Sequence, residues 1–389
     1  MSGPTVTWST SGRAGEGSLA DVLPAVCAGL GVPVTSGEQE RAGGLGLTPA
    51  PRAVVVLVDG LGVDQLTRRL GHAPWMRAHR ERLSGLVSGF PSTTPVSMTT
   101  FGTGLLPGAH GTVGFEVLDP GTGEVFNALS WEDGPVPETW QPARTWFERA
   151  AADGVAVTRT GPGFFDGSGL TRAALRGGRF VAAESLARRV DATLAALTAS
   201  PRALVYLYWG ELDKVGHVHG PESLKWTAEL EEVDRELARL AETLPADASL
   251  TVTADHGMVL CPHDTRVDLA DEPDLVAGVA HLGGEPRATH VWCEPGAAAD
   301  VAAAWRERLG DRAWVRTRAE AVAAGWFGPV PPEHLARVGD VVVASADDLA
   351  VVDSRRMRAQ FLALRGLHGS LSHEEVGIPL LHVPARAVA

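Results

Sequence analysis

The residues of this sequence that could do chemistry are three aspartates and three histidines at the ends of apolar segments, together with one threonine. They are Asp59, Asp213, His217, Asp255, His256, His368 and Thr94. Six mixed carboxylate and imidazole ligands are about what two transition-metal ions require, and a nearby hydroxyl can act as a metal-activated nucleophile. The set therefore points to hydrolysis of a phosphate ester.

Four short runs rich in β-branched residues predict the strands that position these side chains. They are Ala53–Val58, Val155–Thr158, Ala203–Tyr208 and Leu250–Thr253. Continuous apolar runs are typical of strands buried on both faces. Helical patterns separate the runs, at Val63–Leu70, Trp140–Asp153, Ala183–Thr198 and Glu222–Leu244. Strands that alternate with helices predict an α/β layer fold with a mostly parallel central sheet.

The candidate ligands fall where such a sheet binds its ligands. Asp59 directly follows the first run, Asp255 and His256 follow the last, and Asp213 and His217 come a few residues after a third. Ligands of open α/β sheets bind at the carboxyl ends of the strands, so these side chains are expected at one edge. The D-x-x-x-H spacing lets Asp213 and His217 reach one ion from a turn or the first turn of a helix.

The segments outside this pattern suggest three parts. Residues 1–50 are expected to form an N-terminal arm with one short helix at Leu19–Leu30. Residues 51–264 and 366–389 would form the metallohydrolase core, to which the chain returns at His368. Residues 265–365 predict an inserted small α+β cap over the site. Its expected strands and helices are His290–Cys293, Ala313–Arg316, Asp340–Ala344 and Leu349–Asp353, with Ala297–Leu309 and Arg318–Ala324.

Composition narrows the classes of function and location. An apolar fraction of 44% is typical of a globular enzyme, and a net charge of −13 argues against stable nucleic-acid binding. Cys27, Cys261 and Cys293 form no CxxC pair, which favours a reducing compartment. The polar N-terminus and the lack of a long apolar run predict a cytoplasmic protein without a membrane span. The oligomeric state is left open.

The ordered motifs resemble those of a known family. VVVLVDGLGVDQL, PSTTPVSMTTFGTGLLPGAHGTVGFEV, ELDKVGHVHGP, TADHGM and LHGSLSHEEV are similar, in order, to motifs of the alkaline phosphatase superfamily. The nearest branch looks like the nucleotide pyrophosphatase/phosphodiesterases of type I. The resemblance covers roughly residues 50–265 and 366–382. It implies an αβα sandwich of the alkaline phosphatase type.

The resemblance also implies two zinc ions and a role for each site residue. The first ion would be held by Asp59, Asp255 and His256, with Thr94 as the nucleophile bound to it, and the second by Asp213, His217 and His368. Zinc coordination can turn a threonine hydroxyl into an alkoxide, and a second ion can stabilise the leaving oxygen. Manganese or iron could serve in such mixed sites at some cost in affinity.

The Ser/Thr-rich stretch offers more than one hydroxyl. Thr94 matches the family's nucleophile when the motif is laid on the family pattern without a gap, and Thr93 is the alternative. Many phosphodiesterases of this group carry an asparagine three residues later that holds a phosphoryl oxygen, whereas this chain has Ser97. Ser97 and Thr94 are therefore the expected phosphate-binding residues. The same stretch is also typical of a helix N-terminus, whose N–H groups can bind a phosphate oxygen.

The resulting hypothesis is a two-metal hydrolase that cleaves phosphodiester or nucleotide pyrophosphate bonds of a small soluble phosphoester through a phospho-threonine. A phosphomonoesterase or a phosphonoacetate-type hydrolase of the same superfamily is the main alternative, because the groups that the cap offers decide between them. A phosphomutase or a catalytically silent binding protein on this fold stays open. A sulfatase is disfavoured because TTPVS lacks the required arginine, and a nicotinamide site because DGLG is not G-x-G-x-x-G.

Overall fold

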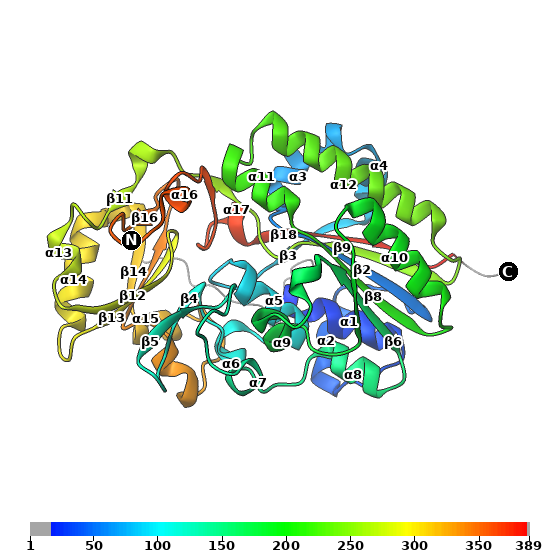
Figure 1. Ribbon diagram of the computed structural model, residues 1–389, viewed down its shortest axis with the longest axis horizontal. Helices are drawn as coiled ribbons and strands as arrows, with labels where there is room; N and C mark the ends of the chain where they lie inside the picture. The colour runs from blue at the N-terminus through cyan, green and yellow to red at the C-terminus, as the bar shows by residue number, and fades with distance from the viewer. Residues whose placement is uncertain (1–16, 387–389) are drawn as a thin grey trace.

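The structure is a computed structural model that describes residues 17–386. Its centre is an eight-stranded sheet in the order β1-β3-β18-β9-β2-β8-β6-β7 (Figure 1). The strands are β1 (Gly17–Ser18), β2 (Arg52–Val58), β3 (Leu83–Val87), β6 (Ala156–Gly161), β7 (Arg179–Ala182), β8 (Ala203–Trp209), β9 (Ala248–Thr253) and β18 (Gly377–Val383). All neighbours pair in parallel except β18, which is antiparallel to β3 and β9. The expected α/β fold with a mostly parallel sheet is confirmed.

Helices cover both faces of this sheet (Figure 1). One layer contains α3 (Val63–Arg68), α4 (Pro74–Ala78), α10 (Leu186–Thr198), α11 (Glu211–His219) and α12 (Leu224–Thr243). The other contains α1 (Val22–Gly29), α5 (Thr94–Thr103), α8 (Trp146–Ala152) and α9 (Gly169–Ala174). Because both faces are covered, β2 is buried along almost its whole length, as its continuous valine run predicts. The result is the expected αβα sandwich.

The register of the central strands sets the position of the site. In β2, Leu57 lies opposite Thr253 of β9 and Val58 lies opposite Trp209 of β8. Three parallel strands therefore reach their carboxyl ends at the same edge of the sheet. The segments that follow them carry most of the candidate ligands.

A second, antiparallel sheet lies within residues 265–365, here called the cap. Its order is β12-β13-β15-β14, formed by β12 (Val279–Glu285), β13 (Ala288–Cys293), β15 (Val341–Ser345) and β14 (Ala313–Thr317). With α14 (Ala298–Leu309) and α15 (Arg318–Ala323) it has its own apolar cluster around Trp305. Other cap side chains, among them Val342 and Trp326, join the main core, so the cap packs directly on it. The division of the chain into an arm, a core and a cap domain stays a prediction.

Several expected elements differ from those observed. The helix expected at Trp140–Asp153 is two short helices, α7 (Pro137–Trp140) and α8, because Pro142 interrupts it and Thr145 starts α8 with a capping box. The strand expected at Leu349–Asp353 is only β16 (Val351–Val352), which pairs with β11 (Val267–Asp268) outside the cap sheet.

The expected N-terminal arm is partly built into the core. From Gly17 onward, β1 extends the main sheet beside β3, and α1 is buried against α5 and α8. Residues 1–16 of the arm and residues 387–389 lie outside the described residues. No helix within residues 17–386 is long and apolar enough to cross a membrane.

Candidate metal centre

Two groups of candidate metal ligands lie side by side at the carboxyl edge of the main sheet. Cluster one is Asp59, Asp255 and His256, and cluster two is Asp213, His217 and His368. Within each cluster the ligand atoms lie within 4.8 Å of one another. The clusters meet where the rings of His256 and His368 stack, with their centroids 3.6 Å apart. All six candidate ligands from the sequence are thus brought together.

Cluster one is formed by the ends of two adjacent strands. Asp59 is the first residue after β2, and β9 ends two residues before Asp255. Because the strand has ended, Asp255 and His256 can both turn toward the site: His256 Nε2 lies 3.3 Å from Asp255 Oδ2 and 3.5 Å from Asp59 Oδ1. The next residue must be small, since a Cβ on Gly257 would lie 2.0 Å from the carbonyl oxygen of Glu374.

Cluster two combines one turn of helix with a distant loop. Asp213 and His217 are four residues apart in α11, and His217 Nε2 lies 3.3 Å from Asp213 Oδ2. His368 follows β17 (Gly366–Leu367), which pairs with β10 (Val259–Leu260) close after cluster one in the chain. Its Nε2 lies 3.3 Å from His217 Nε2 and 3.8 Å from Asp213 Oδ1.

The three histidines share one orientation. Each has its Nδ1 atom 2.7 to 3.0 Å from a backbone carbonyl oxygen. A carbonyl only accepts, so Nδ1 carries the proton and the lone pair of Nε2 points into the clusters. Nitrogen lone pairs from His217, His256 and His368 that converge beside carboxylates are the ligand set that a divalent transition metal prefers.

The aspartates leave one oxygen each for a cation. Asp59 Oδ1, Asp213 Oδ1 and Asp255 Oδ2 are buried and have no hydrogen-bond partner within residues 17–386. The other oxygen of Asp255 accepts hydrogen bonds from the backbone N–H groups of Gly60 and His256, at 3.1 and 3.0 Å. Burial, followed by the charges of Asp255 and Asp213, raises the pKa of Asp59 well above its usual range. A bound cation would offset both effects, so the residues fit a metal site.

Thr94 is the hydroxyl that faces these clusters. It is the first residue of α5, it is half-buried, and its Oγ1 lies 3.3 Å from His256 Nε2. Thr93 is fully buried, and it is the hydroxyl of Thr94 that lies beside a cluster-one ligand. Ser97, one helical turn after Thr94, is also fully buried, and its hydroxyl has no hydrogen-bond partner in the part of the chain that the structure describes. A contact from Ser97 to a phosphate stays a prediction.

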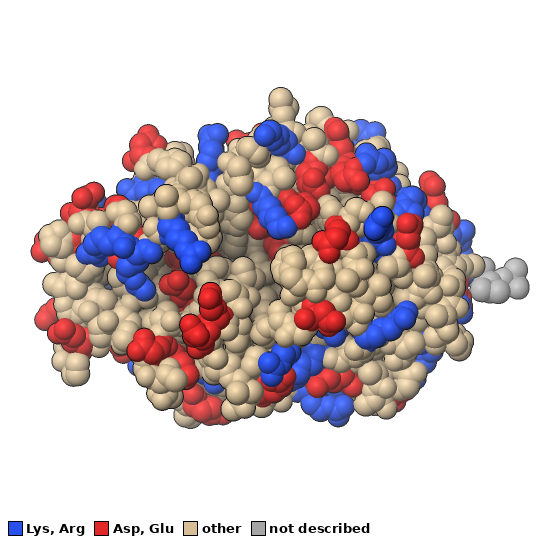
Figure 2. Space-filling model, viewed as in Figure 1, with Lys and Arg blue, Asp and Glu red and all other residues tan. Residues whose placement is uncertain are grey.

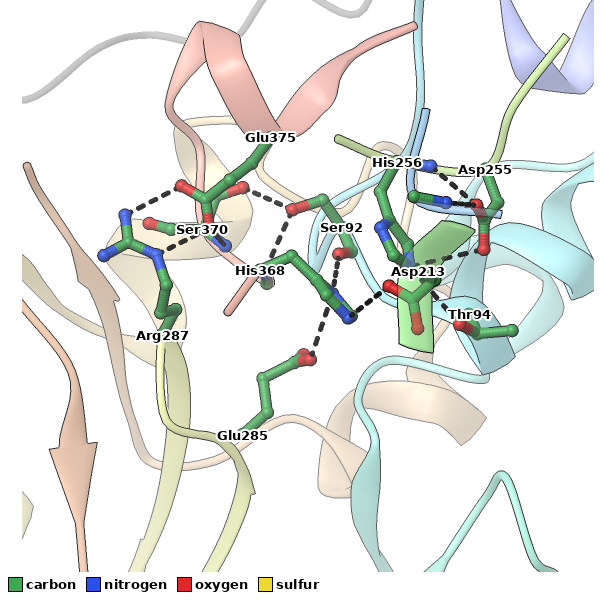
Figure 3. A network of polar contacts seen from close by, with 12 residues as sticks. Ser92, Thr94, Asp213, Asp255, His256, Glu285, Arg287, His368, Ser370 and Glu375 are labelled. Carbon is green, nitrogen blue, oxygen red and sulfur yellow. Dashed lines mark hydrogen bonds and ion pairs between the residues drawn. The ribbon is translucent and has the colours of Figure 1, made fainter. Parts of the chain in front are cut away.

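The structure adds residues around the ligands that the sequence analysis did not single out. The hydroxyl of Tyr208, in β8, donates to Asp59 Oδ2 at 2.5 Å. From the cap, Glu285 Oε2 reaches to 4.0 Å from His368 Nδ1, and Arg287 pairs with Glu375 (Figure 3). Tyr208 belongs to a strand and Glu285 to a glycine-rich segment, so neither shows a distinctive motif. Glu375, in contrast, lies within the family-like segment LHGSLSHEEV.

The face of the molecule that carries the cap is hollowed between the cap and the core (Figure 2). Basic and acidic side chains are interspersed over this face (Figure 2). The expectation of a small substrate instead of a nucleic acid stays a prediction.

The sheet topology and the paired ligand clusters define a class, that of α/β proteins with an alkaline phosphatase-like fold and a candidate two-metal centre at the sheet edge. Residues 53–371 match the family model described as type I phosphodiesterase/nucleotide pyrophosphatase. The chain belongs to this family.

Individual relatives are more distant. An uncharacterized pyrophosphatase/phosphodiesterase of Schizosaccharomyces pombe is 27% identical over 247 residues, which are 60% of this chain and 50% of the relative. A bis(5'-adenosyl)-triphosphatase of Xenopus laevis is 25% identical over 239 residues, or 57% of this chain and 50% of the relative. The chain thus spans about half the length of these curated relatives.

Among solved structures, the fold is similar to that of the murine ectonucleotide pyrophosphatase/phosphodiesterase 5 in an inactive variant bound to AMP. The TM-score is 0.69 at 21% identity, and the match covers 85% of this chain and 87% of the murine chain. At this identity the likeness establishes the fold alone.

Proposed function

We propose that this protein is a metal-dependent hydrolase that cleaves phosphodiester or nucleotide pyrophosphate bonds with two zinc ions and a phospho-threonine intermediate on Thr94. One observation carries the proposal: three imidazole Nε2 atoms, three carboxylate oxygens that have no hydrogen-bond partner among the described residues, and one hydroxyl converge at the carboxyl edge of the sheet. Membership of the type I phosphodiesterase/nucleotide pyrophosphatase family supports it.

The two clusters would each hold one ion. Asp59, Asp255 and His256 would hold the ion next to Thr94, and Asp213, His217 and His368 the other. Zinc bound there lowers the pKa of a neighbouring hydroxyl and neutralises charge on phosphoryl oxygens. Zinc suits this ligand set, with manganese or iron as weaker substitutes.

The chain's own residues perform the bond changes. Thr94 Oγ1 attacks the phosphorus, its O–P bond forms as the bond to the leaving oxygen breaks, and the hydroxyl proton passes to solvent. A water molecule then attacks the same phosphorus, which releases Thr94 and a phosphomonoester. Backbone N–H groups at the start of α5, together with Ser97, would hold the phosphoryl oxygens.

The names of the relatives point to small nucleotide substrates. The Xenopus relative is named for a substrate in which phosphates join two adenosines, and the murine relative was solved with AMP. That murine form is an inactive variant with a threonine-to-alanine change. A nucleotide diester or pyrophosphate is therefore the proposed substrate class. A cytoplasmic location stays a prediction.

Hydrolysis of bis-p-nitrophenyl phosphate, compared with p-nitrophenyl phosphate, tests the proposal. The zinc-loaded protein is expected to cleave the diester faster, and chelation or Thr94→Ala is expected to abolish the reaction. Thr93→Ala should keep most of the activity, because Thr94 has its hydroxyl beside the cluster-one ligand His256. A monoester preference would favour a phosphomonoesterase or phosphonoacetate-type hydrolase. Metal-independent turnover, or full activity of Thr94→Ala, would contradict the mechanism.

A further inference from the structure

The tip of a cap hairpin is joined to the core by a completely buried ion pair. Arg287 lies in the turn between β12 and β13, and Glu375 lies in α17 (His373–Val376) of the core. Arg287 Nε donates to Glu375 Oε1 at 2.7 Å and Nη2 donates to Oε2 at 2.8 Å, and both side chains are 0% exposed. Removing two charges from water is costly, so a purely stabilising role does not explain such a pair.

Both members of the pair are held on further sides. Arg287 Nη1 donates to the carbonyl oxygen of Leu349 at 2.6 Å, and Nη2 donates to that of Ser345 at 3.3 Å, which fixes the guanidinium to the cap. Glu375 Oε1 also accepts a hydrogen bond from the backbone N–H of Ser370 at 2.9 Å. The carboxylate thus connects the cap to a residue that lies two positions after His368.

The loop of residues 368–370 is interlocked with the loop that precedes the nucleophile (Figure 3). Ser92 Oγ donates to the carbonyl oxygen of Ser370 at 2.8 Å, and the backbone N–H of Ser92 donates to the carbonyl oxygen of Gly369 at 2.9 Å. In return, His368 Nδ1 donates to the carbonyl oxygen of Ser92 at 2.8 Å. Because Ser92 lies two residues before Thr94, a shift of the 368–370 loop moves a metal ligand and the nucleophile together.

Helix α17, which carries Glu375, supports cluster one as well. The backbone N–H of Gly257, the residue after His256, donates to the carbonyl oxygen of Glu375 at 2.7 Å. A second cap side chain, Glu285, fills the space beside Gly369, where an added Cβ would lie 2.7 Å from the Glu285 side chain. The cap therefore contacts the 368–370 loop directly and through Glu375.

We propose that Arg287 and Glu375 are a positioning pair, through which the cap fixes the loop of His368 and, by way of Ser92, the loop of Thr94. Neither residue is a ligand, and both act through the backbone N–H of Ser370. The effect on turnover rests on the proposed function. The effect on metal binding needs no substrate, so the two can be tested separately.

Two double variants differ in whether position 375 keeps an acceptor for the backbone N–H of Ser370, to which Glu375 Oε1 is bound at 2.9 Å, while both lose the carboxylate oxygen that accepts from Ser372 Oγ at 2.5 Å. Arg287→Met with Glu375→Gln and Arg287→Met with Glu375→Leu both remove the ion pair without leaving a lone buried charge, but only glutamine keeps a side-chain oxygen for Ser370 N–H. The first measurement is the zinc affinity of the weaker of the two sites, taken without substrate. The second is kcat and KM for the hydrolysis of bis-p-nitrophenyl phosphate. The leucine variant should lose about 10- to 100-fold in zinc affinity and in kcat. The glutamine variant should recover most of both, with KM within about threefold.

An exposed ion pair of the cap provides the matched control. Arg308 and Glu272 have side chains that are 45% and 23% exposed, and Arg308→Met with Glu272→Gln should bind zinc as the wild type does. Thermal unfolding midpoints show which variants are folded in the assay. If neither double variant folds, Arg287→Lys, which keeps the charge but not the paired donors, should show an intermediate loss of zinc affinity.

Three results would overturn the positioning role. These are wild-type zinc affinity in a folded leucine variant, equal losses in the glutamine and leucine variants, or wild-type zinc affinity in Arg287→Lys. A wild-type protein that hydrolyses no phosphoester, but shows the expected pattern of zinc affinities, would contradict the proposed function and leave the positioning role intact.

Discussion

The two ligand clusters are chemically similar and are built in different ways. Cluster one comes from the ends of β2 and β9, which are neighbours in the sheet, and its aspartates and histidine are at most 3% exposed. Cluster two takes two ligands from one turn of α11 and the third, His368, from a loop 151 residues after His217. The His217 side chain is 22% exposed. Cluster one is therefore set by strand register, and cluster two by contacts between distant segments.

This difference determines what each cluster depends on. Strand register is fixed by a ladder of backbone hydrogen bonds and by the burial of both faces, so no single side chain outside cluster one decides where the ends of β2 and β9 lie. The place of His368 depends on Ser92, Ser370 and Glu375, and on the cap residues that hold them. A second metal site can therefore be added beside a sheet edge by a loop, provided that another part of the fold holds the loop.

The largest effects are expected when one ligand is removed from each cluster. Substitution of an outer partner of a metal ligand costs about 10- to 100-fold, so Asp59→Asn and Asp213→Asn should each lower kcat more than about 100-fold. Each variant should bind one zinc ion fewer than the wild type, as measured by metal analysis after gel filtration. The exposed Asp191, which pairs with Arg239, supplies a control in Asp191→Asn. Retention of both ions in either ligand variant would contradict the assignment of that cluster.

The two variants also rank the clusters by stability. Asp59→Asn should retain an ion in cluster two, and Asp213→Asn should retain one in cluster one. His217 is more exposed and His368 lies on a loop. The ion that Asp59→Asn keeps in cluster two should therefore be lost at a chelator concentration about tenfold lower than the ion that Asp213→Asn keeps in cluster one. Zinc retained after dialysis against graded chelator measures this. The reverse order would show that the buried strand ends do not make the tighter site.

The same contrast explains what the sequence could predict. Asp59, Asp255 and His256 come at most three residues after valine-rich or β-branched runs, so local pattern and the sheet-edge rule suffice to place them. The spacing of Asp213 and His217 is equally local. His368 is different, because it follows the whole cap in the sequence, and no local spacing indicates that the chain returns to the site there. Its assignment came from the family motif, and the structure places it through the two-residue pairing of β17 with β10.

The residues that support the ligands, and two of the strands, could not be predicted from the sequence, for physical reasons. Arg287 and Glu375 lie far apart in the chain, so their pairing is a tertiary contact with no local pattern. The strand β18 was missed because Pro379 is unusual inside a sheet. The sheet accommodates it because Pro379 lies opposite Gly85 of β3, whereas pairing on the other side, with β9, begins only at Leu380. The strand β12 was missed because it contains Gly283 and Gly284 and is irregular near its start.

Tyr208→Phe sharpens the account of cluster one. It removes the hydroxyl that donates to Asp59 Oδ2 and leaves the ring, so the affinity of cluster one for zinc should fall about tenfold. Tyr206→Phe, two residues earlier in the same strand, is the matched control, since among the described residues its hydroxyl donates only to Met98 Sδ, at 3.5 Å. Competition with a chelating dye measures both variants. Equal affinities in the two variants would mean that strand register alone orients Asp59.

The smallest expected effect is on the pH dependence of stability. Its measurement tests whether the cap and the core unfold together. His290 in the cap and His110 in the core are both buried, and burial lowers the pKa of each to about 3. The unfolded chain binds these protons near pH 6.5, so stability is present above that pH and is lost as the pH falls toward 3. At pH 5 each buried histidine should lower the free energy of unfolding by up to about 2 kcal/mol relative to its value at pH 7.

His290→Asn and His110→Asn should each reduce the fall in the unfolding temperature between pH 7 and pH 5. If the cap and the core form one cooperative unit, both variants will change the same calorimetric transition. If the cap unfolds separately, His290→Asn will change only the earlier transition, and release of zinc from cluster two should accompany it. Loss of that ion at the later, core transition would contradict the dependence of cluster two on the cap, because His368 would then keep its place after its cap partners had unfolded.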